Sequence, residues 1–328
     1  MSRKKKSYGK RRVERVVRKR RLVVGSRGSI LALKQTESVV ARLRERRPGT
    51  EFLIQTIKTT GDNIYDVALA KIGDKGLFTK ELEVALLKGE IDLAVHSMKD
   101  LPTRLPAGLV VAAIPAREEP YDVLVTRDGK QLSELPPGAV VGTSSLRRQA
   151  QLLAYRPDLV VQSIRGNLDT RLRKLEAGQV DGLILAWAGL ARLGYERRVA
   201  QRIPYDICLP AVGQGALGIE AREDDAEVCA LLREIDDPLS RARVLAERAF
   251  LRSLEGGCQV PIGAVACVQD RELVLEGMVA TLDGRKVIRG LAKGDVGEPE
   301  HVGTSLAEQL LDRGGREILA CAREEWRQ

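Results

Sequence analysis

The chain has 328 residues, a length that accommodates two or three domains with separate cores. Its five cysteines, without a Cys-x-x-Cys pair, and its two histidines argue against a disulfide framework and against a zinc site. The net charge is +9, and because the sequence shows neither a membrane-spanning apolar stretch nor a signal-peptide core, we expect a cytoplasmic protein.

The excess positive charge is concentrated at the N-terminus. Residues 1–21 contain twelve Lys and Arg against one acid, Glu14, whereas the rest of the chain has 42 basic and 44 acidic residues. A segment of this kind is typical of a disordered extension, and binding to nucleic acid or another anionic polymer is the alternative. Aromatic residues are only 3% of the chain, so the body of the protein lacks the stacking residues of a nucleic-acid binder.

Strands and helices alternate from Leu22 onward. The apolar run 22–24 predicts a buried strand, and 30–44 predicts a helix whose apolar side carries Ile30, Leu33, Val40 and Leu43. A second helix, stopped by Gly89 and followed by a strand at 93–95, is indicated by Phe78, Leu82, Ala85 and Leu86.

Two internal echoes indicate a pair of similar lobes. Val23-Val24-Gly25-Ser26 recurs as Val140-Val141-Gly142-Thr143, and the stretch 87–93 recurs as 176–182, each time as a helix stop, a turn and an apolar strand. The alternation favours an α/β fold with a ligand crevice at the strand ends.

The pattern changes after residue 238. A helix is expected at 240–254, followed by strands at 262–267, 272–280 and 286–290 and a final helix at 304–323. Asp283-Gly284 predicts the hairpin turn between the last two strands. This part of the sequence predicts a separate α+β domain.

Cys258 stands at the front of that domain, in Glu255-Gly256-Gly257-Cys258-Gln259-Val260-Pro261. The two glycines and the proline predict a bend that presents the sulfur on a loop. A cysteine there is available for chemistry, and the alternative is a small buried residue in a turn.

An anion site is predicted where residues 142–149 follow a buried strand and open a helix. The hydroxyls of Thr143, Ser144 and Ser145 meet free backbone N–H groups and a positive helix end there. Arg147 and Arg148 would add bidentate clamps for carboxylates, and the alternative is a capped helix followed by two solvated arginines.

Two further segments have the same character. Asn167 can cap the helix after the strand 159–164, and Arg171 in its first turn opposes the helix dipole, which a bound anion would justify. Together with Arg165 and with Arg27 in the matching position of the first lobe, these residues indicate a ligand with several negative groups. Because no Walker pattern is present, carboxylates are favoured over a nucleotide triphosphate.

Asp100 is a candidate acid or base. It follows the strand 93–95 beside Lys99 and faces the predicted crevice, although a surface Lys–Asp pair is the alternative. His96 taken alone is typical of a hydrogen-bonded structural histidine. The polar segment 59–75, broken by Gly61 and Gly73, is expected to be a mobile lid.

Taken together, these runs closely resemble the porphobilinogen deaminase family of tetrapyrrole biosynthesis from about Leu22 to the C-terminus. The matching runs are 73–78, 94–100, 141–149, 165–167, 209–215 and 255–261. Ser26 stands where many members have Thr, Asp74 interrupts a run that is often Gly-Gly-Lys-Gly, and residues 1–21 lie outside the family core.

The resemblance implies two lobes like those of type II periplasmic binding proteins with a central cleft, and a smaller C-terminal α+β domain. The expected extents are 1–21 for the extension, 22–115 with 216–235 for lobe 1, 120–210 for lobe 2 and 238–328 for the C-terminal domain. A monomeric, cytoplasmic enzyme without a metal is implied.

The resemblance also implies the chemistry. Four porphobilinogen molecules are joined, with loss of ammonia, onto a dipyrromethane held by a thioether to Cys258, and hydrolysis releases hydroxymethylbilane. Asp100 is the implied catalytic residue, because its carboxylate can stabilise positive charge on a pyrrole nitrogen. The implied cofactor-binding residues are Cys258, Lys99, Thr143, Ser144, Ser145, Arg147, Arg148 and Gln214. The implied substrate-binding residues are Arg27, Ser29, Lys75, Phe78, Arg165, Arg171 and Arg192. A non-catalytic binding protein on the same scaffold is the rival, and it would need neither Cys258 nor Asp100.

Overall fold

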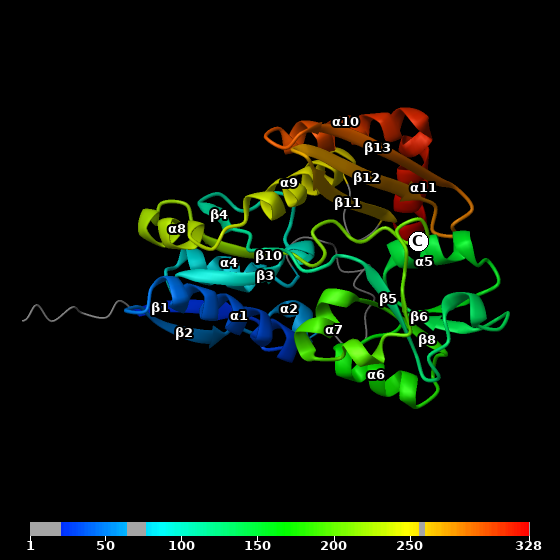
Figure 1. Cartoon of the computed structure of the whole chain (residues 1–328), viewed down its shortest axis with the longest axis horizontal. Coiled ribbons are helices and arrows are strands. Elements are labelled where there is room, and N and C mark those ends of the chain that lie inside the picture. The colour runs from blue at the N-terminus through cyan, green and yellow to red at the C-terminus, as the bar shows by residue number, and fades with distance from the viewer. Residues whose placement is uncertain (1–20, 64–76, 256–259, 328) are drawn as a thin grey trace, which may run out of the picture.

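A computed structural model describes residues 21–63, 77–255 and 260–327, and within these residues the strands form three sheets (Figure 1). Two five-stranded sheets are the centres of two lobes, and a three-stranded sheet belongs to a C-terminal domain. The predicted α/β fold with two lobes and a smaller third domain is therefore confirmed. None of the helices in the described part of the chain has the length and apolar character that crossing a membrane requires.

The helices and strands divide among the two lobes and the C-terminal domain. Lobe 1 comprises β1 (Arg21–Ser26), α1 (Ile30–Arg46), β2 (Glu51–Thr56), α2 (Thr60–Asn63), α4 (Lys80–Leu87), β3 (Leu93–Ser97), β4 (Leu109–Ala113), β10 (Leu217–Arg222) and α8 (Ala226–Arg233). Lobe 2 comprises β5 (Asp122–Thr126), β6 (Val140–Gly142), α5 (Leu146–Tyr155), β7 (Val160–Gln162), α6 (Leu168–Glu176), β8 (Gly182–Ala186), α7 (Trp187–Leu193) and β9 (Gln201–Arg202). The C-terminal domain comprises α9 (Pro238–Ser253), β11 (Ile262–Gln269), β12 (Glu272–Ala280), β13 (Val287–Asp295), α10 (Pro299–Leu310) and α11 (Arg316–Arg327).

The two lobes repeat one strand arrangement. The strand order is β2-β1-β3-β10-β4 in lobe 1 and β7-β6-β8-β5-β9 in lobe 2. In each sheet the first three strands are parallel and the fourth is antiparallel to its neighbours. Because β5 follows β4 in the chain and β10 follows β9, two crossover segments connect the lobes. The first sequence echo therefore marks strands β1 and β6, which occupy the same position in their sheets.

The prediction of which residues form the apolar, buried side of α1 is only partly correct. Val40 and Leu43 are buried in the core of lobe 1 together with Leu22 and Val24 of the neighbouring strand. Ile30, however, is 56% exposed, and it lines the cleft between the lobes. The first turn of the helix projects toward the cleft, so its apolar residues serve that wall instead of the core.

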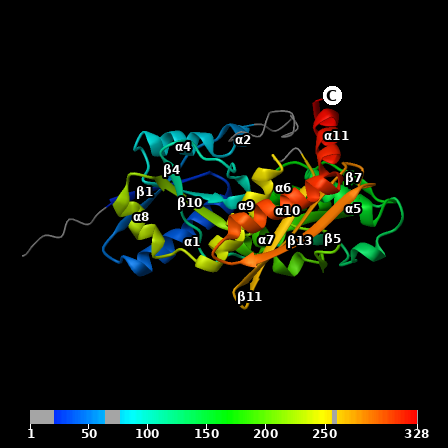
Figure 2. The ribbon, with the colours of Figure 1, turned by 90° about the horizontal axis from the view of Figure 1, so that it is seen from above.

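The C-terminal domain is an antiparallel sheet covered by helices. β12 has the predicted bounds, and α9 and α10 pack against the sheet, with Phe250 fully buried between them. Seen from above, the domain overlies the junction between the two lobes (Figure 2). The prediction of one final helix over 304–323 is wrong: the helix is interrupted at 311–315, where Gly314 adopts a φ of 99° that favours glycine.

One buried carboxylate ties both crossover segments to the C-terminal domain. Glu247 on α9 accepts hydrogen bonds from Arg117 Nη1 at 2.6 Å and from the backbone N–H of Gly213 at 2.7 Å. It also accepts the backbone N–H of Ala266 at 2.9 Å. Since Arg117 precedes β5 and Gly213 precedes β10, this cluster fixes both crossover segments against the third domain.

Candidate active site

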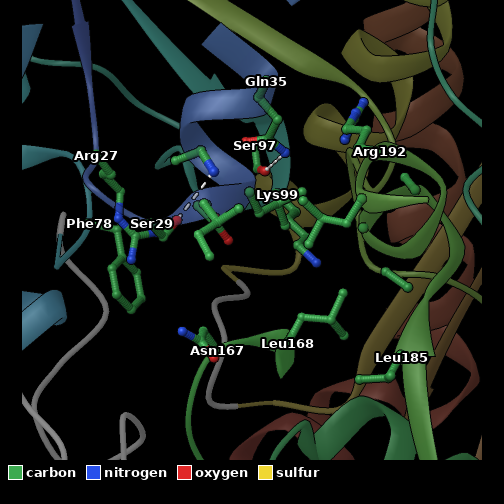
Figure 3. Close-up of a pocket in the computed structure, with 18 of the residues that line it drawn as sticks. Arg27, Ser29, Gln35, Phe78, Ser97, Lys99, Asn167, Leu168, Leu185 and Arg192 are labelled. Atoms are coloured by element: carbon green, nitrogen blue, oxygen red, sulfur yellow. Dashed lines mark hydrogen bonds between the residues drawn. The ribbon is translucent and has the colours of Figure 1, made fainter. Parts of the chain in front are cut away.

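A cleft of about 920 Å³ lies between the two lobes (Figure 3). Lobe 1 contributes the first turn of α1 and the end of β3, whereas lobe 2 contributes the first turns of α6 and α7. Gln214 and Gly215, from the second crossover, complete the wall. The crevice is therefore located at strand ends and helix N-termini, as the alternating pattern predicts.

The cleft is strongly cationic. Among the described residues that line it, eight are basic and two are acidic: Arg27, Lys58, Lys99, Arg148, Arg165, Arg171, Lys174 and Arg192 against Asp100 and Asp169. So many cations in one cleft repel one another, and an anionic ligand with several charges relieves that repulsion. The predicted polyanionic ligand thus matches the composition of the walls.

Lys99 and Asp100 enter the cleft from a single 3₁₀ turn at the end of β3. Met98, the first residue of that turn, is fully buried and anchors it, while the two following side chains are exposed to the cleft. Although Lys99 has solvent contact, the surrounding cleft walls desolvate its ammonium group and lower its pKa. The charge of Arg148 also lowers this pKa, whereas Asp100 opposes the shift.

Asp122 holds the two adjacent arginines of α5. Its fully buried carboxylate accepts hydrogen bonds from Arg147 Nη1 at 2.8 Å, from Arg148 Nη2 at 2.7 Å and from Gln214 Nε2 at 2.9 Å. Burial alone would raise the pKa of Asp122, but the two guanidinium charges outweigh it and hold this pKa well below its usual range. Asp122 therefore stays ionised and orients both arginines.

The two arginines differ in what they face. Arg148 lines the cleft, whereas Arg147 is absent from the described lining residues and also donates to the backbone carbonyl of Leu209. Two buried polar atoms at the cleft, Arg148 Nε and Gln214 Oε1, have no hydrogen-bond partner among the described residues. A donor and an acceptor are thus available to a ligand that carries both carboxylates and N–H groups.

The first turn of α6 brings two more arginines to the cleft. Asn167 caps this helix by accepting the Thr170 N–H at 2.9 Å, as predicted, and Arg171 Nε donates to the Gly166 carbonyl at 3.0 Å. Burial, followed by the charges of Arg148 and Arg165, lowers the pKa of Arg171 to about 10. The charges of Arg148 and Arg165 therefore both repel that of Arg171.

On the opposite wall, the Arg27 guanidinium lies 4.2 Å from the centre of the Phe78 ring, and Ser29 caps α1 by accepting the Ala32 N–H. Figure 3 shows these side chains facing Asn167 and Leu168 across the cleft. On the lobe 2 side, Arg192 of α7 donates to the Gly215 carbonyl at 2.6 Å, and burial lowers the pKa of Arg192.

Most of the predicted site residues meet in this cleft: Arg27, Ser29, Phe78, Lys99, Asp100, Arg148, Arg165, Arg171, Arg192 and Gln214. Thr143, Ser144 and Ser145 are not among its described lining residues, and the Ser144 hydroxyl donates to the Ile164 carbonyl at 2.7 Å. Their role, like that of Arg147, stays a prediction. Cys258, Lys75 and most of the expected lid lie outside the described residues.

The sequence reasoning missed Lys58 and Lys174 in the cleft and the organising role of Asp122. An acid placed directly before the apolar run Val123-Leu124-Val125 is the signal that could have identified Asp122. Lys58 in the loop after β2 and Lys174 inside α6 carry no comparable signal.

Comparisons with known proteins identify the family. A model described as porphobilinogen deaminase, dipyromethane cofactor binding domain, matches residues 22–230, and one for the C-terminal domain matches 241–312. The chain is 62% identical to porphobilinogen deaminase of Desulforudis audaxviator, covering 93% of this chain and 99% of that protein. It is 59% identical to the Pelotomaculum thermopropionicum protein of the same name, with 94% and 99% covered. Among solved structures, the Bordetella pertussis BvgS periplasmic VFT2 domain aligns with a TM-score of 0.39 and 14% identity, covering 66% of this chain and 86% of that domain. This last likeness is weak.

Proposed function

Because the chain belongs to the porphobilinogen deaminase family, we propose that it joins four porphobilinogen molecules head to tail with loss of ammonia and releases hydroxymethylbilane by hydrolysis. This activity makes it a transferase of tetrapyrrole synthesis. The observation that carries the proposal is the placement of Asp100 in a cleft whose walls are dominated by Lys and Arg. Each pyrrole unit bears an acetate and a propionate, so a growing chain presents the multiple carboxylates that such walls bind.

The cleft residues fit a dipyrromethane cofactor. Lys99 and Arg148 offer positive charge to its carboxylates. The buried Arg148 Nε and Gln214 Oε1, which have no hydrogen-bond partner within the described parts of the chain, offer a donor and an acceptor. When bound through a thioether to Cys258, the cofactor supplies the pyrrole carbon onto which the first substrate unit is joined. Asp122 holds Arg148 in place at the cleft through its hydrogen bond to Nη2.

Asp100 stabilises the charge that develops during the reaction. As ammonia leaves the substrate, positive charge accumulates on the pyrrole nitrogen, and a carboxylate beside that N–H favours this charged state. The buried Met98 and the 3₁₀ turn hold Asp100 at the cleft, so little reorganisation is needed when the charge appears.

The remaining cations bind the substrate chain. Arg27 with its Phe78 contact acts from lobe 1, while Arg165, Arg171 and Arg192 act from lobe 2. Ligand carboxylates placed between the two walls neutralise cations of both lobes, and this favours a closed arrangement. We propose that Thr143, Ser144, Ser145 and Arg147 contribute through the start of α5, and that Lys75 contacts the chain from the lid segment.

The protein is proposed to act as a monomer in the cytoplasm. Both expectations follow from membership of the family. Light scattering after size-exclusion chromatography tests this: a mass near that of one 36.0 kDa chain is expected, and a stable dimer would overturn it.

Intact-mass measurement tests the assignment. Wild type is expected to exceed its sequence mass by two linked pyrrole units, and Cys258→Ala is expected to lack this excess. Cys267→Ala, which removes an exposed cysteine on β11, is the matched control and should keep it. If wild type gains no mass even after incubation with porphobilinogen, a non-catalytic binding protein is the better description.

A further inference from the structure

Lys58 and Arg27 leave the sheet of lobe 1 side by side. They follow the neighbouring parallel strands β2 and β1, whose last residues, Thr56 and Ser26, are paired in register. The backbone N–H of Ile57 also donates to the Ser26 carbonyl at 2.8 Å, which keeps the two segments together beyond the strands. Both Lys58 and Arg27 line the cleft. Adjacent strand ends therefore bring two cations to the same wall.

The backbone that follows Lys58 is also held in place. Thr60 donates to the Glu81 carboxylate of α4 from its backbone N–H, at 2.9 Å, and from its hydroxyl. Gly61 donates its N–H to the Leu77 carbonyl at 2.8 Å. The Lys58 side chain, by contrast, is exposed, and it makes no hydrogen bond or ion pair with another described residue. The backbone of this lysine is thus fixed at the cleft while its ammonium group is left available.

Phe78 connects the segments that carry the two cations. The Arg27 guanidinium lies 4.2 Å from the centre of the Phe78 ring. Gly61, three residues after Lys58, packs against the same ring, where an added Cβ atom would lie 2.2 Å from Cε1. Because glycine has no side chain, the segment after Lys58 can approach the ring this closely. Arg27, Lys58 and Phe78 therefore belong to one part of the lobe 1 wall.

No acid in the described parts of the chain pairs with the Lys58 ammonium group. Asp100 and Asp169, the acids among the described lining residues, form no ion pair with it. Glu81, on the neighbouring helix α4, is engaged instead by the two donors of Thr60. An exposed cation without a counterion among these residues, placed on a cationic wall, attracts the negative groups of a ligand.

We propose that Lys58 and Arg27 divide between them the two carboxylates of one pyrrole unit of the substrate, a role that rests on the function proposed above. Each unit carries an acetate and a propionate, so two cations held near one aromatic ring match one unit. Lys58 binds one carboxylate as a point charge, and the Arg27 guanidinium binds the other. The unit belongs to the substrate, because Arg148 and Gln214, which fit the cofactor, come from lobe 2 and the second crossover.

Steady-state kinetics of the whole holoenzyme test this subsite. Lys58→Met should raise KM for porphobilinogen about fivefold, because an exposed charge that binds a carboxylate is lost. It should change kcat by less than about twofold, since the lysine takes no part in the chemical step. Lys58→Arg should restore KM. Lys34→Met is the matched control, because it removes an exposed lysine of α1 that pairs with Glu37 outside the cleft lining, and it should leave KM unchanged.

Two monoesters of porphobilinogen, one methylated on the acetate and one on the propionate, identify the carboxylate that Lys58 binds. In wild type each ester should bind more weakly than porphobilinogen. In Lys58→Met one of the two esters should bind as well as porphobilinogen does, because the charge that esterification removes has already lost its partner. The other ester should keep its full penalty, since Arg27 is still present. Lys34→Met should show the wild-type penalty for both esters.

The outcomes separate the subsite from a general effect of charge. An unchanged KM in Lys58→Met, or ester penalties that are the same in Lys58→Met as in wild type, would overturn the proposal. A rise in KM that Lys34→Met reproduces would assign the effect to net charge and would also overturn it. Failure of wild type to consume porphobilinogen would instead refute the proposed function. Calorimetric binding of porphobilinogen and its two monoesters to the same variants would then test the subsite without turnover.

Discussion

Asp92 and Asp181 make the same pair of hydrogen bonds in the two lobes. Asp92 Oδ2 accepts the Val23 N–H at 2.7 Å, and Asp181 Oδ2 accepts the Val140 N–H at 2.8 Å. Each aspartate also donates its backbone N–H to the carbonyl of the same valine, at 2.8 and 2.7 Å. Each acid therefore fastens the turn before β3 or β8 to the strand beside it, β1 or β6, and the second sequence echo has a structural cause.

Replacing either acid should destabilise its own lobe. We expect Asp92→Ala and Asp181→Ala each to cost about 1–2 kcal/mol, because a backbone N–H loses a carboxylate acceptor. The two costs should add in the double variant, since the sites share no partner. Denaturant unfolding measures this, with Asp128→Ala as the surface control. A cost at only one of the two sites would contradict the equivalence of the lobes.

Asp100→Asn should abolish most activity without changing the fold. Turnover is expected to fall by several powers of ten, because the charge that faces the pyrrole nitrogen is removed while the shape is kept. Porphobilinogen consumption and the thermal unfolding midpoint are the measurements. Asp169→Asn is a suitable control, since Asp169 is the other acid of the cleft and is engaged by the Tyr195 hydroxyl at 2.8 Å. A loss below about tenfold would disprove the proposed role of Asp100.

Arg148→Leu and Arg147→Leu should have different consequences. Arg148 lines the cleft, so its loss should impair cofactor assembly or chain elongation, which intact mass and turnover report. Arg147 is buried against Asp122 and Leu209, so its loss should in addition lower stability, by about 3–5 kcal/mol. Normal cofactor content and normal kinetics in Arg148→Leu would refute the carboxylate-binding role.

Asp122 should contribute a pH-dependent part of the stability. Its pKa in the folded protein is held below the ordinary value of an aspartate, so its ionised form is favoured by folding. The resulting stabilisation is complete above about pH 4 and is lost as the pH falls toward the folded-state pKa. Unfolding free energies of wild type and Asp122→Asn should therefore converge in acid. Equal pH slopes for the two proteins below pH 4 would contradict this.

Substrate affinity should weaken at alkaline pH through Lys99. Because desolvation lowers the pKa of this lysine, it loses its positive charge at a lower pH than an ordinary lysine does. We expect KM for porphobilinogen to rise over that range, and Lys99→Arg to remove the rise because arginine keeps its charge. A KM that rises equally in both proteins would assign the effect to another group.

Local sequence patterns predict an individual element well where tertiary packing favours the same structure as the local preference of the residues. The cap at Asn167 and the bounds of β12 follow from residue chemistry and alternation. The apolar spacing of the final helix persists and predicts a continuous helix, whereas Gly314 permits a break that the spacing does not show. Ile30 likewise follows the helical period, and only the position of its helix relative to the cleft decides its exposure.

The sequence alone determined the class of fold, the cationic character of the ligand site and most of its residues, because strand–helix alternation and clustered arginines are local properties. Only the tertiary structure decided which charges act together. Asp122, Arg148 and Gln214 come from three distant segments, and their contacts arise because the two crossover segments bring those parts of the chain to one point. Glu220, an acid inside an apolar strand, meets His96 and Glu83 only because sheet pairing and helix packing place them on one buried face.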